Sequence, residues 1–266
     1  MKKILPWIFG GVLIIVVVAT VIVMNPAGSN TTSHQVNNYQ QIHKLNIDVQ
    51  SDVVVKSGAK FKVESNLPAA KENKIKLDDD EIKITEKEHH HFMGFHLPEF
   101  VINIAGFFHP QKHVTIVTLP KDIKLTDVVI NSDSGDVKLS DASLSALKID
   151  ANSGDVTLAN VNVKHNAVIG TDSGDTILKN IAVANISVDS DSGDVDADNL
   201  KAQRINLNSD SGDVNIKNQT DTTYAKAVID SASGDINLEN TVVNDSEVTA
   251  DSGDVNLSNS KLIDKK

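Results

Sequence analysis

The amino-acid sequence predicts an all-β protein, a single-stranded parallel β-solenoid that is preceded by one transmembrane helix. The tripeptide Ser-Gly-Asp occurs seven times, at intervals of 19, 20, 19, 19, 22 and 19 residues. A short run of alternating apolar residues follows each copy, and a long uncharged segment opens the chain. Self-similarity at a period near 20 residues is typical of solenoids, in which one unit buries its apolar face only by stacking on the next.

Each repeat has the same internal order. The alternation after Ser-Gly-Asp, as in Val137 and Leu139, predicts a half-buried strand. An Asn or Asp ends this run, and a second strand leads to an aliphatic residue four positions before the next serine. Two strands and two corners in 19–22 residues leave no room for a helix, so each repeat is expected to form one coil. The seven serines are Ser134, Ser153, Ser173, Ser192, Ser211, Ser233 and Ser252.

The two corners of the coil lead to two expectations. Gly135 and its six equivalents are expected to turn the chain with a positive φ, which glycine adopts without steric cost. The recurrent Asn or Asp that ends the first strand, from Asp141 to Asn259, is expected to form a ladder of side-chain amides along the stack.

The chain begins with Lys2 and Lys3 and continues with the uncharged segment Ile4–Met24. As a helix, these 21 residues would be about 31 Å long, which matches a bilayer core of about 30 Å. Residues 1–24 are therefore expected to be a short cytoplasmic start and a transmembrane anchor. The alternative is a signal peptide that is cleaved near Ala27.

The positive-inside rule places the two lysines in the cytoplasm. The expected localisation is thus the cell membrane, with a single pass and an extracellular C-terminal domain. Residues 25–41 are polar and are expected to be a flexible linker.

Residues 42–130 are expected to be an N-terminal β region that starts the solenoid and caps its open end, and residues 131–266 the repeat solenoid itself. The stretch 89–113 holds six of the nine histidines and five of the seven phenylalanines. This loop has three interpretations: a hairpin whose Phe side chains cover the end of the solenoid, an exposed apolar loop that contacts a membrane or partner, and a zinc site.

The second half of the chain is strongly acidic. Residues 131–266 hold 23 Asp and Glu against 11 Lys and Arg, whereas residues 1–130 hold 13 against 14. Twelve of these 23 acidic residues belong to the Asp-Ser-Gly-Asp corners. The favoured interpretation is that each corner carboxylate bonds backbone N–H groups at its own turn and otherwise faces water. The alternative is an edge that binds a cation such as calcium.

Composition and motifs exclude several function classes. The absence of cysteine excludes disulfides, thiolate metal sites and a cysteine nucleophile. A net charge of −11 argues against nucleic acid as a partner. The carboxylates recur at equivalent corners, and His165 is expected to lie on the surface, so an enzyme that acts on wall polysaccharide is the least favoured hypothesis. No catalytic, cofactor-binding or metal-binding residues and no cofactor are predicted.

The chain resembles a known bacterial family, the putative adhesins, which includes LiaG-like proteins. The membrane-anchored start, the segment Val114–Pro120 and the tandem coils that begin at Ile130 carry this resemblance. It implies a membrane-anchored solenoid associated with the cell envelope and assigns no site residues. The expected function is a non-enzymatic adhesin or envelope-stress-associated interaction module, with an envelope protein or glycan as partner. The alternative is a cation- or glycan-binding module that uses the acidic corner.

Overall fold

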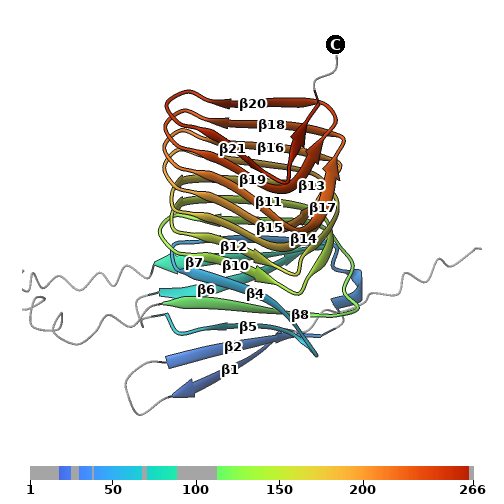
Figure 1. Cartoon of the computed structure of the whole chain (residues 1–266). Coiled ribbons are helices and arrows are strands. Elements are labelled where there is room, and N and C mark those ends of the chain that lie inside the picture. The colour runs from blue at the N-terminus through green and yellow to red at the C-terminus, as the bar shows by residue number, and fades with distance from the viewer. Residues whose placement is uncertain (1–17, 25–29, 38, 68–70, 89–112, 264–266) are drawn as a thin grey trace, which may run out of the picture.

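In the computed structural model, the chain is a stack of β-coils that is closed at its N-terminal end by antiparallel strands (Figure 1). The structure describes residues 18–24, 30–37, 39–67, 71–88 and 113–263. Within these residues, β-strands make up the regular structure apart from one short 3-10 helix, η1 (Tyr39–Gln41). The predicted all-β parallel solenoid is confirmed.

The first strand of each coil lies in one parallel stack, here called stack A. Its strands pair in register, so that Val137 lies opposite Val53 on one side and Val156 on the other. In spatial order stack A contains β8 (Val114–Pro120), β4 (Asp52–Gly58), β10 (Val137–Ser140), β12 (Val156–Ala159), the first residues of β14 (Thr176–Ser190), β15 (Val195–Lys201), β17 (Val214–Tyr224) and β19 (Ile236–Val243), and then β21 (Val255–Ser258).

The strand that leads to each Ser-Gly-Asp corner lies in a second parallel stack, stack B. In spatial order it contains β7 (Glu81–Glu88), β3 (Lys44–Val49), β9 (Leu125–Ser132), β11 (Ser143–Ser153), β13 (Asn162–Ser173), the last residues of β14, β16 (Arg204–Ser209), β18 (Lys226–Ser231) and β20 (Ser246–Ala250). A short third side joins the two stacks. It is formed by the beginnings of β11 and β13, the middle of β14, the ends of β15, β17 and β19, and β22 (Lys261–Leu262).

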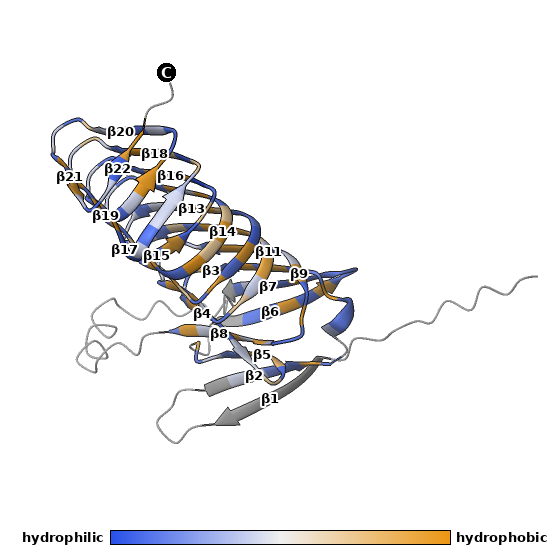
Figure 2. Ribbon diagram, turned by 45° about the vertical axis from the view of Figure 1, so that its right-hand side comes forward, coloured by the Kyte–Doolittle hydropathy of each residue, from blue (hydrophilic) through white to orange (hydrophobic). Residues whose placement is uncertain are grey.

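The core is the space between these sides, filled by columns of aliphatic residues. Hydrophobic and hydrophilic residues alternate along the strands, as Figure 2 shows. The column at the position four residues before each serine is fully buried from Ile130 through Ile229. The inward positions of stack A are equally buried from Val137 through Leu238. Burial of aliphatic side chains, each worth about 1.5–3 kcal/mol, stabilises the stacked coils and not the isolated coil.

The N-terminal end of stack A continues as antiparallel strands. β5 (Phe61–Ser65) pairs with β8, and β2 (Asn30–Val36) pairs with β5. In stack B, β6 (Lys71–Asp78) forms an antiparallel hairpin with β7. Phe61, the first residue of β5, is fully buried.

The N-terminal residues that the structure describes differ from the expected helix and linker. Val18–Met24 is strand β1, which pairs antiparallel with β2, and both β2 and η1 fall inside the expected linker 25–41. The run Val18–Met24 is rich in β-branched residues, which suit a strand as well as an apolar helix. No helix among the described residues is long and apolar enough to cross a membrane.

Two expectations fall largely on residues that the structure does not describe. The anchor residues 1–17 lie outside the described residues, as do residues 89–112 of the His- and Phe-rich loop. The three interpretations of that loop therefore remain predictions. His113, at its end, places Nδ1 3.2 Å from the backbone oxygen of Asn66.

The assignment of positive φ to the corner glycines is wrong for most of them. Among the seven, φ is positive at Gly174 and Gly193, at 149° and 159°, near the extended region. The left-handed corner belongs instead to the Asp or Asn that ends the first strand, with φ between 47° and 57°. These corner residues are Asp141, Asn160, Asn180, Asn199, Asn240 and Asn259. Asn and Asp tolerate this conformation because their short polar side chains bond locally.

Glycine is required at the other corner because successive coils approach too closely for a side chain. A Cβ built on Gly212 would overlap the carbonyl oxygen of Gly193 and lie 2.6 Å from its carbonyl carbon. The same overlap recurs from Gly154 to Gly253, each against the backbone of the preceding glycine. The recurrent glycine is thus a condition of stacking.

The 22-residue coil holds a buried polar cluster. Tyr224 is fully buried, and its hydroxyl donates a hydrogen bond of 2.9 Å to the backbone oxygen of Leu200. Asn218 is also buried, and its Nδ2 lies 3.1 Å from Thr241 Oγ1 and 3.4 Å from the Tyr224 hydroxyl. Burial raises the pKa of Tyr224 to about 12, although the hydrogen bond from Asn218 lowers it in part.

Replacing Gly212 with alanine is expected to lower the free energy of unfolding by about 1–3 kcal/mol, as overpacking does. Gly170 is the matched control, because a Cβ there would meet only the side chain of Asp150, with Oδ1 at 3.2 Å. Gly170→Ala is expected to change stability by less than about 0.5 kcal/mol. Urea denaturation of both variants measures the difference. Equal stabilities would contradict the steric role of the corner glycine.

Tyr224 is expected to make stability depend on alkaline pH. Its pKa is higher in the folded state than the ordinary value of 10.0, so its contribution is complete below that value and is lost as the pH rises toward 12. Between about pH 9 and pH 12, the stability advantage of the wild type over Tyr224→Phe should shrink by about 2 kcal/mol. Urea denaturation at several pH values measures this advantage. If the stability difference between the wild type and Tyr224→Phe stays constant with pH, the Tyr224 hydroxyl is not buried in its neutral form.

Candidate binding surfaces

The corner carboxylates form a continuous ladder along the solenoid. The Asp after each corner glycine accepts, through Oδ1, the backbone N–H of the equivalent Asp in the following coil, at 2.8–3.3 Å. The ladder therefore links coils, whereas the sequence predicts bonds within a single turn. Its members are Asp52, Asp136, Asp155, Asp175, Asp194, Asp213, Asp235 and Asp254.

Asp52 is a member that the repeat does not identify. Its Oδ1 accepts the N–H of Asp136 at 3.0 Å, so it begins the ladder one coil before the first Ser-Gly-Asp. The glycine is missing there, because Ser51 directly precedes Asp52. In the sequence, the position of Asp52 in the ladder is indicated by the run Val53–Val55, which has the apolar pattern of the later repeats.

The ladder supports the structural interpretation of the acidic corner. Each bonded carboxylate satisfies a backbone donor that stacking would otherwise leave without a partner. The remaining corner acids, such as Asp191 and Asp210, are exposed to solvent. The residues that the structure describes contain no cluster of three or more His, Asp or Glu positioned to hold a metal ion.

The predicted asparagine ladder is present at the opposite corner. Asn180 donates through Nδ2 to Asn160 Oδ1, and Asn199 donates in the same way to Asn180, both at 3.1 Å. The 22-residue coil interrupts this series, because Asn218 is buried and the backbone N–H of Gln219 bonds Asn199 Oδ1 instead. This ladder is another repeated structural element.

The geometry does not single out one carboxylate for catalysis. The carboxylates of the ladder have equivalent bonds to backbone, so they do not differ in the way that an acid and a base must. His165 is exposed on β13, as the sequence predicts. A binding site for a specific partner is therefore expected among side chains that differ from coil to coil.

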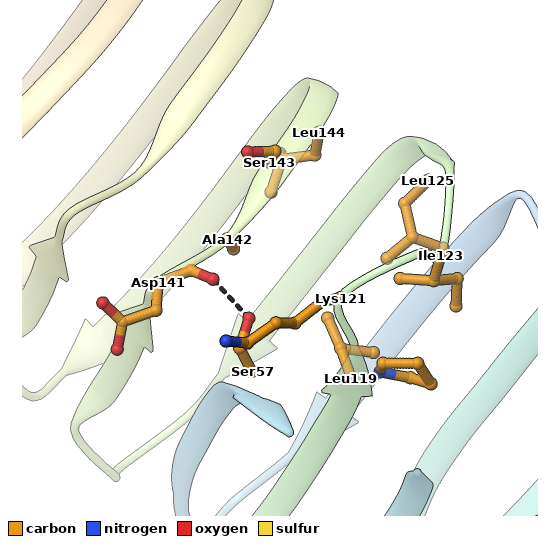
Figure 3. A pocket seen from close by; sticks show the side chains of 10 residues that line it. Ser57, Leu119, Lys121, Ile123, Leu125, Asp141, Ala142, Ser143 and Leu144 are labelled. Atoms are coloured by element: carbon orange, nitrogen blue, oxygen red, sulfur yellow. Dashed lines mark hydrogen bonds between the residues drawn. The ribbon is translucent and has the colours of Figure 1, made fainter. Parts of the chain in front are cut away.

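Pockets line the third side of the solenoid among the residues that the structure describes. The first, of about 310 Å³, lies between the link from β8 to β9 and the first left-handed corner (Figure 3). The Ser57 hydroxyl donates a hydrogen bond to the Asp141 backbone oxygen there, and Leu119 and Ile123 line one wall. The second, of about 290 Å³, lies beside the insertion that follows Asn218.

A longer concave surface lies on stack B and is here called the axial groove. It has a volume of about 470 Å³ and crosses four coils, from β13 through β14 and β16 to β18. Outward side chains from two neighbouring columns line it. The first column is Asn166, Asn185, Arg204 and Lys226, and the second is Val168, Ser187, Asn206 and Val228.

No sequence motif contains the residues of the axial groove. They lie 19–22 positions apart and differ in type from repeat to repeat, so no motif joins them. The sequence feature that could have indicated this surface is the placement of Arg204 and Lys226 at equivalent positions in an otherwise acidic segment.

Loss of a ladder carboxylate is expected to destabilise the fold without regard to calcium. Asp213 Oδ1 accepts the N–H of Asp235 at 2.8 Å, so Asp213→Ala should cost about 1–2 kcal/mol. The exposed Asp230, which carries the same charge, is the control and should cost less than about 0.5 kcal/mol as alanine. Melting in the presence of calcium and of a chelator measures both variants. A wild-type melting temperature that rises with calcium, with the rise abolished by Asp213→Ala, would favour the cation site instead.

Comparison with solved structures finds a similar fold in a protein described as a putative adhesin. A putative adhesin from Bacteroides fragilis aligns with a TM-score of 0.50 and 14% identity, over 88% of this chain and 96% of that chain. A putative cell adhesion protein from Clostridium sporogenes aligns with a TM-score of 0.37 and 14% identity, over 93% and 99% of the two chains. A putative lipid binding protein from Parabacteroides distasonis gives 0.34 and 12%, over 90% and 98%. At these identities, the first alignment shows the fold alone.

Comparison with curated proteins finds no significant match. A model of the family described as Toastrack DUF4097 matches residues 42–175 and again residues 165–265. The two matches together cover most of the chain, including the coils that carry both ladders. The protein therefore belongs to the Toastrack DUF4097 family.

Proposed function

We propose that this protein is a non-enzymatic surface protein of the bacterial envelope, in which the β-solenoid is an adhesin-type interaction module outside the cell. The observation that carries the proposal is the construction of the solenoid. Its inward columns form the core and its corners form ladders, so the outward columns of side chains remain free for recognition. The description of the Bacteroides fragilis structure as a putative adhesin supports this reading.

We also propose that the N-terminal segment attaches the protein to the membrane in a single pass. Lys2, Lys3 and the uncharged stretch Ile4–Met24 support this attachment and favour an orientation with the solenoid outside. Strand β1 and the end of a membrane helix use the same residues, Val18–Met24, so a given molecule has one or the other. An envelope protein or a glycan is the proposed partner.

A cation-binding function of the acidic corner is the weaker candidate. The Oδ1 atoms of the corner ladder already accept backbone hydrogen bonds between coils. Their recurrence is therefore explained without an ion.

Charged substitutions in the apolar segment are expected to release the protein from membranes. Ile14→Asp with Val17→Asp should cost about 5–7 kcal/mol of insertion free energy if both side chains lie near the centre of the span. This variant leaves all residues of β1 unchanged, and Ile14→Leu with Val17→Leu is its matched control. Carbonate extraction of membranes measures attachment. Retention of the Asp variant in the membrane fraction would contradict the anchor.

The interaction function predicts saturable binding to cell envelopes without turnover. The purified full chain should bind isolated envelopes, and thermal unfolding should abolish this binding. Prolonged incubation should release no reducing sugar ends or peptides from the envelopes. Catalytic release of soluble products would contradict the proposal, and so would binding that survives unfolding.

A further inference from the structure

The axial groove is a shallow, open surface. Its volume of about 470 Å³ lies within the range of about 300–1,000 Å³ that small-molecule sites occupy. Its floor is apolar at the two ends, where Val168 is 44% exposed and Val228 is half-buried. Between them the floor is polar, because Asn206 Nδ2 donates a hydrogen bond of 3.2 Å to Ser187 Oγ. Polar groups follow one side of this floor, in the column from Asn166 to Lys226.

The backbone beneath the groove is not free to bind a partner. β13, β14, β16 and β18 each pair with a parallel strand on both sides. An added peptide strand would find no open edge there, because edge pairing requires unpaired N–H and C=O groups. A ligand of the groove must therefore be recognised by side chains.

The groove contains a pair of basic residues in an acidic solenoid. Arg204 and Lys226 are both exposed and lie opposite each other in neighbouring strands. Neither makes an ion pair with another residue that the structure describes. Like charges at directly opposed positions destabilise a sheet, so an anionic group placed between them would relieve this repulsion.

The surroundings of the basic pair limit the charge of the ligand. The next coil places Asp245 beside Lys226 and Glu247 beside Val228. Asp189 also lies on the neighbouring outward column. These carboxylates oppose a densely charged polyanion, so the fitting ligand carries isolated anionic groups separated by neutral units.

The amides of the groove favour hydroxyl groups as the neutral units. Asn185 Nδ2 donates to Asn166 Oδ1 at 2.9 Å, and Arg204 Nη1 lies 3.4 Å from Asn185 Oδ1. This arrangement leaves the second amide proton of each Asn and most guanidinium donors available to a ligand. The C–H faces of a sugar ring suit the apolar side chains of Val168 and Val228, and the hydroxyl groups of the sugar suit Ser187 and Asn206 between them.

The spacing of the coils also favours a sugar chain over a peptide. Neighbouring coils lie about 4.8 Å apart, which is close to the length of one pyranose unit in an extended chain. An extended peptide places side chains on one face about 6.8 Å apart, out of step with the coils. A sugar chain along the axis would meet an equivalent position in every coil.

We propose that the axial groove binds a short oligosaccharide that carries a carboxylate or phosphate at Arg204 and Lys226. This inference rests on the proposed interaction function and names the chemistry of its partner. The carboxylated and the phosphorylated ligand have the same chemistry in common, an anionic group on an otherwise neutral, hydroxyl-rich chain.

Calorimetric titration of the purified full chain tests the proposal with three tetrasaccharide-length probes. A hyaluronan tetrasaccharide carries a carboxylate on alternate sugars, a phosphodiester-linked tetrasaccharide carries phosphate, and chitotetraose is neutral. The proposal expects binding of at least one anionic probe, with an affinity about tenfold or more above that of chitotetraose. The anionic probe that binds more tightly identifies the source of the charge.

Arg204→Gln combined with Lys226→Gln should weaken that binding about tenfold or more. Lys179→Gln is the matched control, because Lys179 is an exposed cation on stack A, and it should leave the affinity unchanged. Melting temperatures verify that the variants fold, and Ser187→Phe tests the groove by steric block without a change of charge. The proposal is overturned if no anionic probe binds, if chitotetraose binds equally well, or if the control and double variants lose affinity equally. Envelope binding that persists in the double variant would reject the groove and leave the interaction function standing.

Discussion

The close approach of successive coils at the glycine corner is the constraint on which the rest of the structure depends. The backbone of each corner glycine lies so near the preceding one that a Cβ would overlap a carbonyl group. This contact holds the coils in register, and the register brings the N–H of each following Asp within 2.8–3.3 Å of the carboxylate below. The Ser-Gly-Asp motif is thus one stacking device with two parts, a glycine that permits contact and an Asp that satisfies the backbone.

Register also turns each position of the repeat into a column, and the column decides which residues are tolerated. Inward columns admit aliphatic residues, because they fill the space between stacks A and B. Carboxylates placed about 4.8 Å apart would repel one another, yet each ladder carboxylate accepts an N–H hydrogen bond that offsets this cost. The amide ladder avoids repulsion altogether, because an amide both donates and accepts.

The repeated columns were predictable from sequence, whereas the exceptions were not. The period, the buried aliphatic column from Ile130 and the amide ladder follow from residue type and spacing. Residue type and spacing do not predict which of the two corners, the Gly or the Asn, has the left-handed conformation, because both residues adopt positive φ. The close contact that requires glycine exists only between neighbouring coils. No motif marks the position of Asp52 in the corner ladder, because it lacks the preceding glycine. Val18–Met24 suits a strand as well as a membrane helix.

Recognition in such a molecule must reside in positions that do not repeat. A column whose members are all equivalent offers the same surface at every coil and cannot distinguish one partner from another. The column Asn166, Asn185, Arg204 and Lys226 changes residue type from coil to coil, while its backbone is held by the same pairing as its neighbours. Under the proposed interaction function, the repeated corners supply rigidity and the variable outward columns supply specificity. This division explains why the motif that reveals the fold reveals so little about the ligand.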